Sequence, residues 1–398
     1  MKRLVAVAAL ATFASPAQDK PAPPPIWQQG RPPEMADSKL APYPPKMTVT
    51  PPEEIPIDKV KVPEGFKVEL WAHGLPGGRA MARGDKGKLY VGTRAIGRVY
   101  EITDQGGKRT VRIVAEKMTQ PAGVAFRNGS LYVASIDKML RYDGIEDKPD
   151  VQPVDLSSKF NFPPLQHHNW KYLAFGPDKK LYVPFGGPCN ICEPPTDEYA
   201  QIRRYNPDGS GMEVIARGIR NSIGFDWDPR TGDLWFTDNG RDWMGDEGPE
   251  EELNHVSKVG LNFGFPYCHA NGIPDPQYKK QDPCKGVTMP VALLGPHAAV
   301  LGMIFYTGRM FPAAYKDTIF IARKGSWNRT KLFGYDVVNV KVDPDGKNPK
   351  VTPFMTGFMD SQENKFWGRP VYVLQMPDGA LLVSDEQVGA IYRVSYRK

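Results

Sequence analysis

The sequence predicts an all-β protein, a six-bladed β-propeller with inserted loops and an N-terminal proline-rich arm. The 398 residues include 39 glycines and 40 prolines, which favour many turns over long helices. Short runs of alternating apolar residues also follow turn signals, as expected for antiparallel strands with one buried face. Six such runs begin at Leu89, Leu131, Leu181, Leu234, Ile319 and Leu381. A β-sandwich is the alternative, but six units at blade-sized spacing exceed what one sandwich usually needs.

The first 17 residues are expected to be a signal peptide. Lys2 and Arg3 supply a positive region, residues 4–13 form a short apolar core, and Ser15 and Ala17 are small residues suited to a cleavage site. A frayed helix or a membrane anchor is the alternative, but the apolar run is too short to span a bilayer. The sequence therefore predicts a periplasmic or secreted protein without a transmembrane segment.

Residues 18–57 are rich in proline and lack apolar periodicity, so they are expected to form an extended linker or arm. Trp27 and Tyr43 could attach this arm to the body. Residues 58–398 are expected to form the propeller domain. Most of the six runs are followed by a second strand candidate, and the larger gaps after Leu234 and Ile319 imply long inserted loops. In a propeller such loops converge on the axis, so residues far apart in sequence can share one pocket.

The four cysteines form two local pairs, Cys189 with Cys192 and Cys268 with Cys284. Export permits disulfides, so both pairs are expected to be bridged. The first pair has the spacing of a redox motif, but no βαβ pattern surrounds it. Glu193 follows Cys192 where covalent haem attachment needs a histidine. A zinc site with four thiolates remains a further alternative.

The net charge of +6 is small for this length, and there is no run of lysines and arginines. A nucleic-acid partner therefore has little support. A weakly basic surface suits a small anionic ligand or an acidic protein partner.

Adjacent histidines, His167 and His168, precede an apolar strand run. Neighbouring side chains on an extended chain point to opposite sides, so only one of the two is expected to face the axis. A neutral imidazole there could accept a proton near physiological pH. Two hydrogen-bonded loop histidines are the alternative. His297 precedes another apolar run, and a structural role is expected for it.

The segment 216–266 places several polar groups close together. Arg220 and Asn221 offer a planar fork for carboxylates and an amide that both donates and accepts. An acidic loop, residues 238–252, follows a strand run and suits Ca²⁺, which accepts backbone carbonyls as readily as carboxylates. Structural pairing of the arginine with this loop, or a solvated acidic loop, explains the same residues.

A second basic group surrounds the sequence GSWN, residues 325–328. Arg323, Lys324, Arg329 and Lys331 flank it, and Arg369 lies between aromatic residues in FWGRP. Cations beside aromatic rings could bind a flat polyanion by charge and stacking. Exposed basic loops are the alternative.

Taken together, these motifs resemble the soluble dehydrogenases that use pyrroloquinoline quinone (PQQ) to oxidise sugars, in particular the branch named for sorbosone dehydrogenase. The resemblance spans residues 60–398. It rests on LAFGPDKKLYV after His168, GIRNSIGF, WFTDNGRDWMGDEGPEEELN, GLNFGFP, HAAVLGMIFYTG, GSWNR and GRPVYVLQMPDGALLVSD, in this order. The family fold is a six-bladed propeller, which agrees with the repeat pattern.

The resemblance implies an active site at the mouth of the central channel, with PQQ and Ca²⁺ as cofactors. His168 falls on the family's general base. Arg220 and Asn221 fall on the motif that contacts the reactive quinone end, where Arg220 also has a catalytic role. The backbone carbonyls of Gly240 and Arg241 fall on the Ca²⁺-binding turn.

The three carboxylates of PQQ need cations, and Lys324 and Arg369 fall near the residues that supply them in the family. Two departures stand out. His167 replaces an acid found beside the base in glucose-oxidising members, and Arg241 replaces a proline in the metal turn. A backbone ligand tolerates that second change, although the long Arg241 side chain could reshape the pocket.

The sequence thus predicts an exported enzyme that oxidises an aldose or a related sugar aldehyde or alcohol. Hydride would pass to PQQ and electrons to a separate soluble or membrane acceptor, since no haem motif is present. Two alternatives are a Ca²⁺-dependent lactonase on the same architecture and a non-enzymatic binding propeller that uses the arm for assembly.

Overall fold

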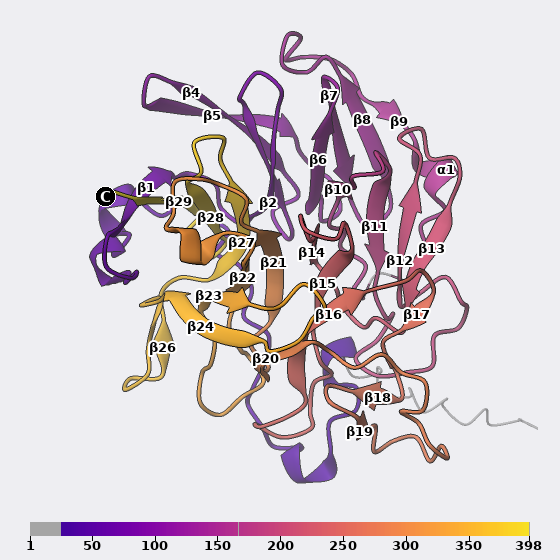
Figure 1. Ribbon diagram of the computed structural model, residues 1–398. Coiled ribbons are helices and arrows are strands. Elements are labelled where there is room, and N and C mark those ends of the chain that lie inside the picture. Colours follow the sequence, from indigo (N-terminus) through magenta and orange to yellow (C-terminus); the bar gives the residue numbers. More distant parts are fainter. Residues whose placement is uncertain (1–24, 166, 398) are drawn as a thin grey trace, which may run out of the picture.

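Six sheets of four or five strands, which are mainly antiparallel, surround a common axis and form the blades of a six-bladed β-propeller (Figure 1). The computed structural model describes residues 25–165 and 167–397. The predicted fold class is therefore confirmed. The expected signal peptide, residues 1–17, lies outside the described residues. No helix among the described residues has the length and apolarity needed to cross a membrane.

The first three blades follow one another along the chain. Blade 1 contains β2 (Gly78–Arg83), β3 (Leu89–Thr93), β4 (Val99–Gln105) and β5 (Lys108–Ala115). Blade 2 contains β6 (Gly123–Arg127), β7 (Ser130–Ala134), β8 (Met139–Asp143) and β9 (Val154–Asp155). Blade 3 contains β10 (Ala174–Phe175), β11 (Leu181–Phe185), β12 (Gln201–Tyr205), β13 (Glu213–Arg217) and β17 (Leu261–Asn262), which pairs in parallel with β13. The short helix α1 (Ser157–Phe160) connects blades 2 and 3.

The other three blades close the ring. Blade 4 contains β14 (Gly224–Trp227), β15 (Leu234–Asp238), β16 (Glu250–Val256) and β20 (Ala292–Pro296). Blade 5 contains β21 (Val300–Phe305), β22 (Ile319–Arg323), β23 (Asp336–Lys341) and β24 (Lys350–Met355). Blade 6 contains β27 (Pro370–Gln375), β28 (Leu381–Asp385), β29 (Ala390–Tyr396) and β1 (Phe66–Ala72). All six predicted runs coincide with the second strand of a blade.

The second strands are buried on both faces. Every residue of β3, β11, β15 and β28 is buried. The prediction of one exposed face was therefore wrong for these strands, because each blade is stacked between two others. Solvent contact is left to outer strands such as β5, most of whose residues are partly or fully exposed.

Two short hairpins and one turn are inserted between strands of the propeller. The hairpin β18 (Cys268–His269) and β19 (Ile273–Pro274) lies between β16 and β20, and the hairpin β25 (Met359–Asp360) and β26 (Lys365–Phe366) precedes β27. The turn η5 (Ala313–Tyr315) lies between β21 and β22. Both expected disulfides are present, Cys189–Cys192 and Cys268–Cys284, so every cysteine of the chain is bridged.

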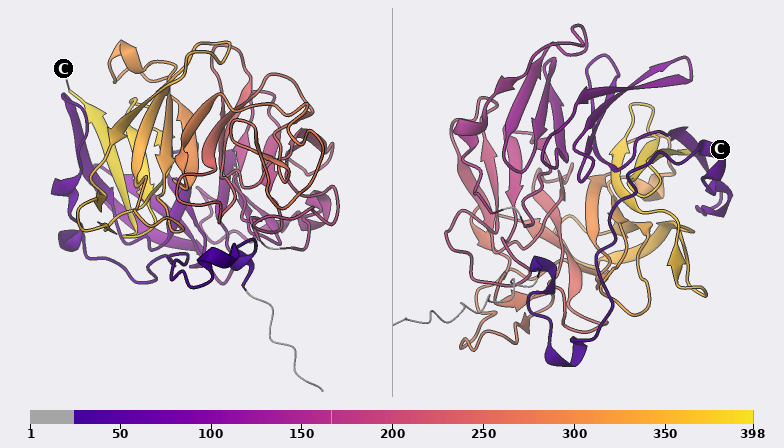
Figure 2. Two further views of the ribbon diagram at one scale, coloured as in Figure 1. Left: turned by 90° about the horizontal axis from the view of Figure 1, so that it is seen from below. Right: turned by 180° about the vertical axis from the view of Figure 1, so that it is seen from behind.

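The described part of the arm, residues 25–57, runs across one end of the propeller (Figure 2). It is extended and interrupted by single turns, η1 (Ile26–Gln28), η2 (Pro33–Met35), η3 (Pro52–Glu54) and η4 (Ile57–Lys59). Prolines occupy the first position of η2 and η3, where a missing N–H costs nothing.

The ring is closed by the first strand of the propeller, because β1 pairs antiparallel with β29 from Phe66 opposite Tyr396 onward. The Phe66 ring lies edge-on to Phe311, Phe354 and Tyr396, with centroid distances of 4.7, 5.0 and 4.9 Å. Such aromatic pairs add packing energy to the ladder hydrogen bonds.

A Phe66→Ala variant should lower the free energy of unfolding by about 2–4 kcal/mol, since it removes a partly buried ring from four aromatic neighbours at the seam. Urea denaturation followed by tryptophan fluorescence measures this change. The matched control Val111→Ala, on the outer strand β5 and 39% exposed, should change it by less than about 0.5 kcal/mol. Equal effects of the two substitutions would contradict this role of Phe66.

Candidate functional site

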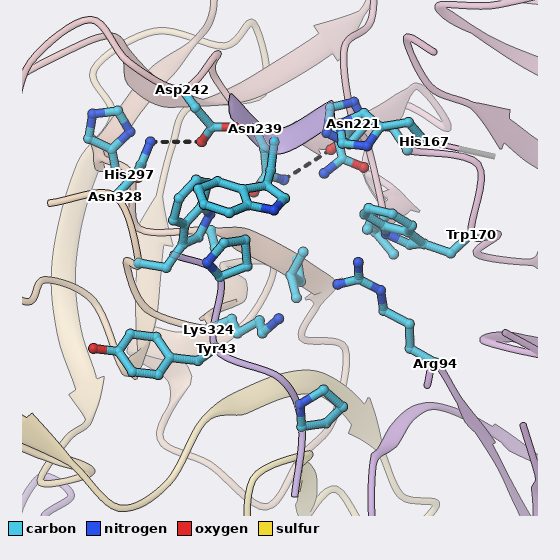
Figure 3. A pocket seen from close by; sticks show the side chains of 18 of the residues that line it. Tyr43, Arg94, His167, Trp170, Asn221, Asn239, Asp242, His297, Lys324 and Asn328 are labelled. Carbon is cyan, nitrogen blue, oxygen red and sulfur yellow. Dashed lines mark hydrogen bonds between the residues drawn. The ribbon is translucent and has the colours of Figure 1, made fainter. Parts of the chain in front are cut away.

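A cavity of about 520 Å³ opens at the end of the propeller that the arm crosses (Figure 3). Its lining residues come from the arm and from loops of all six blades. They include, from the propeller, Arg79, Arg94, His167, His168, Trp170, Arg220, Asn221, Gly240, Asp242, Glu251, His297, Lys324, Asn328 and Arg369. The volume lies within the range of about 300–1,000 Å³ that is usual for small-molecule sites.

The sequence-predicted site residues meet at this cavity. His168, Arg220, Asn221, Gly240, Lys324 and Arg369 all line it. Arg241 is the exception. Its guanidinium is buried and pairs with Asp275 at 2.7 Å, and it donates to Gln277 at 3.0 Å. The Arg241 side chain therefore does not enter the pocket; it is directed into the protein and donates to the Gly30 carbonyl of the arm at 3.1 Å.

Both adjacent histidines line the cavity, contrary to the prediction for an extended chain. The His168 backbone has a φ of 51°, in the left-handed region, so the two side chains do not alternate. Their ring centroids lie 4.0 Å apart. Gly186 makes this arrangement possible, because a Cβ there would lie 2.4 Å from the His168 carbonyl oxygen.

His168 is held as a neutral imidazole. Its Nδ1 lies 3.1 Å from the Gly187 carbonyl oxygen, which can only accept, so Nδ1 carries the proton and Nε2 keeps its lone pair. Burial, then the neighbouring His167 and Arg220, lower the pKa of His168 well below its usual value. Burial also lowers the pKa of His167 to about 3. A side chain of this kind can accept a proton at neutral pH.

Arg220 is fixed by hydrogen bonds from its guanidinium to three residues. It donates to the carbonyl and side-chain oxygens of Asn190 at 2.9 and 2.7 Å, to the Asn239 carbonyl at 3.2 Å and to Asp242 at 3.1 Å. Asp238 accepts from the backbone N–H groups of Arg220 and Asn221 at 2.9 and 2.6 Å. Asp238 therefore shapes this turn and is not exposed to bind a cation.

Several carboxylates of the acidic loop accept hydrogen bonds from other groups of the protein. Asp242 accepts from Asn328 at 2.7 Å in addition to Arg220 (Figure 3). Glu251 accepts from the backbone N–H groups of Gly240 and Ala299 at 2.6 and 3.0 Å, and burial raises its pKa to about 8. Within residues 25–165 and 167–397, no group of three or more His, Cys, Asp and Glu side chains is arranged to hold a metal. A Ca²⁺ site at Gly240 and Arg241 would depend on backbone carbonyls and stays a prediction.

The cavity also carries a cationic cluster, which we define as Arg79, Arg94, Lys324 and Arg369. Glu386 forms salt bridges with Lys324 at 2.7 Å and with Arg79 at 3.4 Å. Burial opposes ionisation of Glu386, yet Lys324 and Arg79 hold its pKa well below the usual range. Burial and then Arg369 lower the pKa of Lys324 well below its usual value. Among the described residues, Glu386 is the one carboxylate that forms salt bridges with this cluster, and it does so with Arg79 and Lys324 only.

Arg94 forms no salt bridge within the described part of the chain, and its guanidinium carbon lies 3.9 Å from the ring centroid of Trp170. Burial and then Arg79 lower its pKa to about 10. Figure 3 shows the Arg94 and Lys324 side chains pointing into the cavity. Sequence reasoning missed Arg79, Arg94 and Glu386, which belong to no shared motif and meet only in the folded ring.

Comparisons with known proteins agree with this fold. A family model described as TrAA12-like matches residues 60–397. An uncharacterized protein of Borreliella burgdorferi is 31% identical over 352 residues, which cover 85% of this chain and 91% of that protein. The match extends over nearly the whole propeller.

Two solved structures resemble the chain in fold. The calcium structure of the Trichoderma reesei Carbohydrate-Active Enzymes Family AA12 protein has a TM-score of 0.71 at 20% identity, covering 85% of this chain and 97% of that one. The holo form of the pyranose dehydrogenase PQQ domain from Coprinopsis cinerea has a TM-score of 0.69 at 21% identity, covering 84% and 97%.

Replacing Glu386 by glutamine should lower the free energy of unfolding at pH 7 by about 3 kcal/mol, because buried cations lose their counterion. The folded-state pKa of Glu386 is depressed, so its contribution is complete above the unfolded-state pKa and disappears as the pH falls. Urea titrations at pH 7 and pH 4 should therefore show a smaller difference at pH 4. The control Glu363→Gln breaks an exposed salt bridge with Lys365 and should lower the free energy of unfolding by less than about 1 kcal/mol. If both variants lose the same free energy of unfolding, Glu386 has no special role as a buried counterion.

Proposed function

This chain belongs to the TrAA12-like family of soluble PQQ-dependent sugar dehydrogenases, and from that premise we propose that it oxidises an aldose or a related sugar aldehyde or alcohol with PQQ as cofactor. One observation carries the proposal. The same cavity contains both the cationic cluster, whose positive charges outnumber the carboxylates paired with them, and a buried, neutral histidine, His168. The first feature suits an anionic cofactor, and the second suits removal of a proton from a sugar hydroxyl.

The residues present fit PQQ, a flat ortho-quinone with three carboxylates. Arg79, Arg94, Lys324 and Arg369 offer four cations, and one buried nitrogen of Arg79 has no hydrogen-bond partner in the described structure. An anion bound there would offset the burial and the repulsion by Arg369, which together lower the pKa of Lys324. Trp170, under the Arg94 guanidinium, adds a flat aromatic surface.

We assign Ca²⁺ to the turn at Gly240 and Arg241, through their backbone carbonyls. Gly240 lines the cavity beside Asp242 and Glu251, whose carboxylates would balance a divalent charge from nearby. The calcium structure of the Trichoderma reesei relative supports a role for this ion in the family.

When bound, PQQ supplies the two-electron acceptor. His168 Nε2 would take the proton of the substrate hydroxyl, since Nδ1 is already engaged by Gly187. Arg220 and Asn221 would orient the reacting end, and the charge of Arg220 would stabilise negative charge that develops there. Hydrogen bonds to Asn190, Asn239 and Asp242 keep Arg220 in place before substrate arrives.

Electrons would leave to a separate soluble or membrane acceptor in the periplasm or outside the cell. The proposed substrate is an aldose or a sorbosone-type sugar. A lactonase or a purely binding propeller would leave the cationic cluster without a use, so neither is favoured.

Purified protein should bind PQQ in the presence of Ca²⁺, with a new absorbance band, a raised melting temperature and sugar-dependent reduction of an electron-accepting dye. Lys324→Ala should weaken PQQ binding at least tenfold, because it removes a cation from a buried anion site. The exposed control Lys365→Ala should bind PQQ as the parent does. Absence of both the absorbance change and turnover would refute the proposed function.

His168→Ala should lower kcat by about 100–10,000-fold while PQQ binding is kept, because it removes the base and none of the cofactor's cations. In the parent enzyme kcat should be constant between pH 6 and 8 and fall only in more acidic solution, since the pKa of His168 is depressed. The matched control is His73→Ala, at an exposed position outside the cavity. Full activity of the His168 variant, or a rise in kcat through pH 7, would remove His168 as the base.

A further inference from the structure

The arm and the propeller contribute opposite kinds of surface to the cavity. The arm supplies residues 26–27 and 41–45, which are all apolar or aromatic. We call these two stretches the roof. The charged and amide side chains of the cavity come from the propeller. The cavity therefore has one polar side that suits an anionic cofactor and one apolar side that covers it.

The first stretch of the roof is joined to the Arg220 loop region. The Trp27 carbonyl accepts a hydrogen bond from Trp243 Nε1 at 2.7 Å, and its indole lies edge-on to Trp327 at 5.9 Å between centroids. The next contact is made by the Gln29 carbonyl, which accepts from Asn190 Nδ2 at 2.6 Å. Because Asn190 also holds Arg220, this part of the arm has a defined position relative to the reacting end.

The second stretch lies beside the cationic cluster. The Tyr43 ring packs edge-on against Phe366 at 5.1 Å, and its carbonyl accepts from Arg369 at 3.4 Å. Tyr43 and Lys324 both line the cavity (Figure 3). The arm thus crosses the cavity from one end of the proposed cofactor site to the other, and it is attached at both ends.

We propose that the roof limits the substrate to sugars of monosaccharide size; this rests on the proposed function, which places PQQ against the propeller side. A cavity of about 520 Å³ that already holds a flat cofactor leaves room for a small second molecule only. On the side that the roof covers, further sugar units would meet the arm. Its indole and proline surfaces can pack on the apolar face of one sugar ring and exclude water from it.

The test compares the full-length double variant Trp27→Ala/Tyr43→Ala with the parent, both loaded with PQQ and Ca²⁺. Substrates are an aldose that the parent oxidises and the trisaccharide built from it. The ratio of kcat/KM for trisaccharide over monosaccharide should rise at least tenfold, mainly through a lower KM for the trisaccharide. Release of bound PQQ after addition of a chelator, followed by absorbance, should be at least fivefold faster because the cover is thinner.

Two controls separate the roof from general effects of the arm. Met47→Ala/Val49→Ala changes exposed arm residues, 59% and 54% accessible, outside the cavity lining and should leave both measurements unchanged. Trp27→Phe/Tyr43→Phe keeps both rings and should retain the selectivity. An unchanged substrate ratio in the alanine variant with PQQ bound would overturn the roof alone. A parent protein that binds no PQQ would overturn the proposed function, and the roof with it.

Discussion

Closure of the ring by β1 and β29 is the constraint on which the site depends. The cationic cluster is drawn from blade 1, through Arg79 and Arg94, and from the loops before β23 and β27, through Lys324 and Arg369. These loops are neighbours only because blade 6 lies beside blade 1. Ser384 Oγ donates to the Arg79 carbonyl at 2.7 Å across that seam, and Glu386 lies between Arg79 and Lys324. Like charges can be held together in this way because strand pairing and core packing elsewhere supply the free energy that opposes their repulsion.

An excess of buried positive charge lowers the stability of the folded protein unless a bound anion neutralises it. Desolvation and mutual repulsion depress the pKa values of Lys324 and Arg94, whereas the single carboxylate of Glu386 is held ionised. The other half of the cavity carries buried carboxyl groups, and burial raises the pKa values of Asp242 and Glu251. A molecule with several carboxylates at one end and a divalent ion at the other would relieve both halves at once. This charge division links the fold to a cofactor of the PQQ type more strongly than any single residue does.

The sequence was sufficient to predict local features of the fold, but it did not predict contacts between residues on opposite sides of the ring closure. The six strand runs, both disulfides and the common location of His168, Arg220 and Lys324 followed from turn signals, cysteine spacing and the resembling motifs. Two-sided burial of β3 was missed because alternation within one strand does not report the blade stacked on its other face. Arg79 and Glu386 were missed because they are about 300 residues apart in the chain and no local pattern links them. The orientation of His167 and His168 depended on one left-handed residue, which a histidine pair does not signal.

The departure at Arg241 gains a physical explanation from its contacts. A proline at this position would have no side-chain donor, whereas Arg241 joins its own loop to two other segments of the chain. It pairs with Asp275 in the disulfide-bridged insertion, where His269 Nε2 donates to the same carboxylate at 2.8 Å. It also donates to the Gly30 carbonyl in the arm at 3.1 Å. A Cβ on Gly30 would lie 2.6 Å from this guanidinium and 2.9 Å from Ile191, so only glycine permits so close an approach. The residue that departs from the family pattern at this turn therefore also helps to fix the arm, through its contact with Gly30.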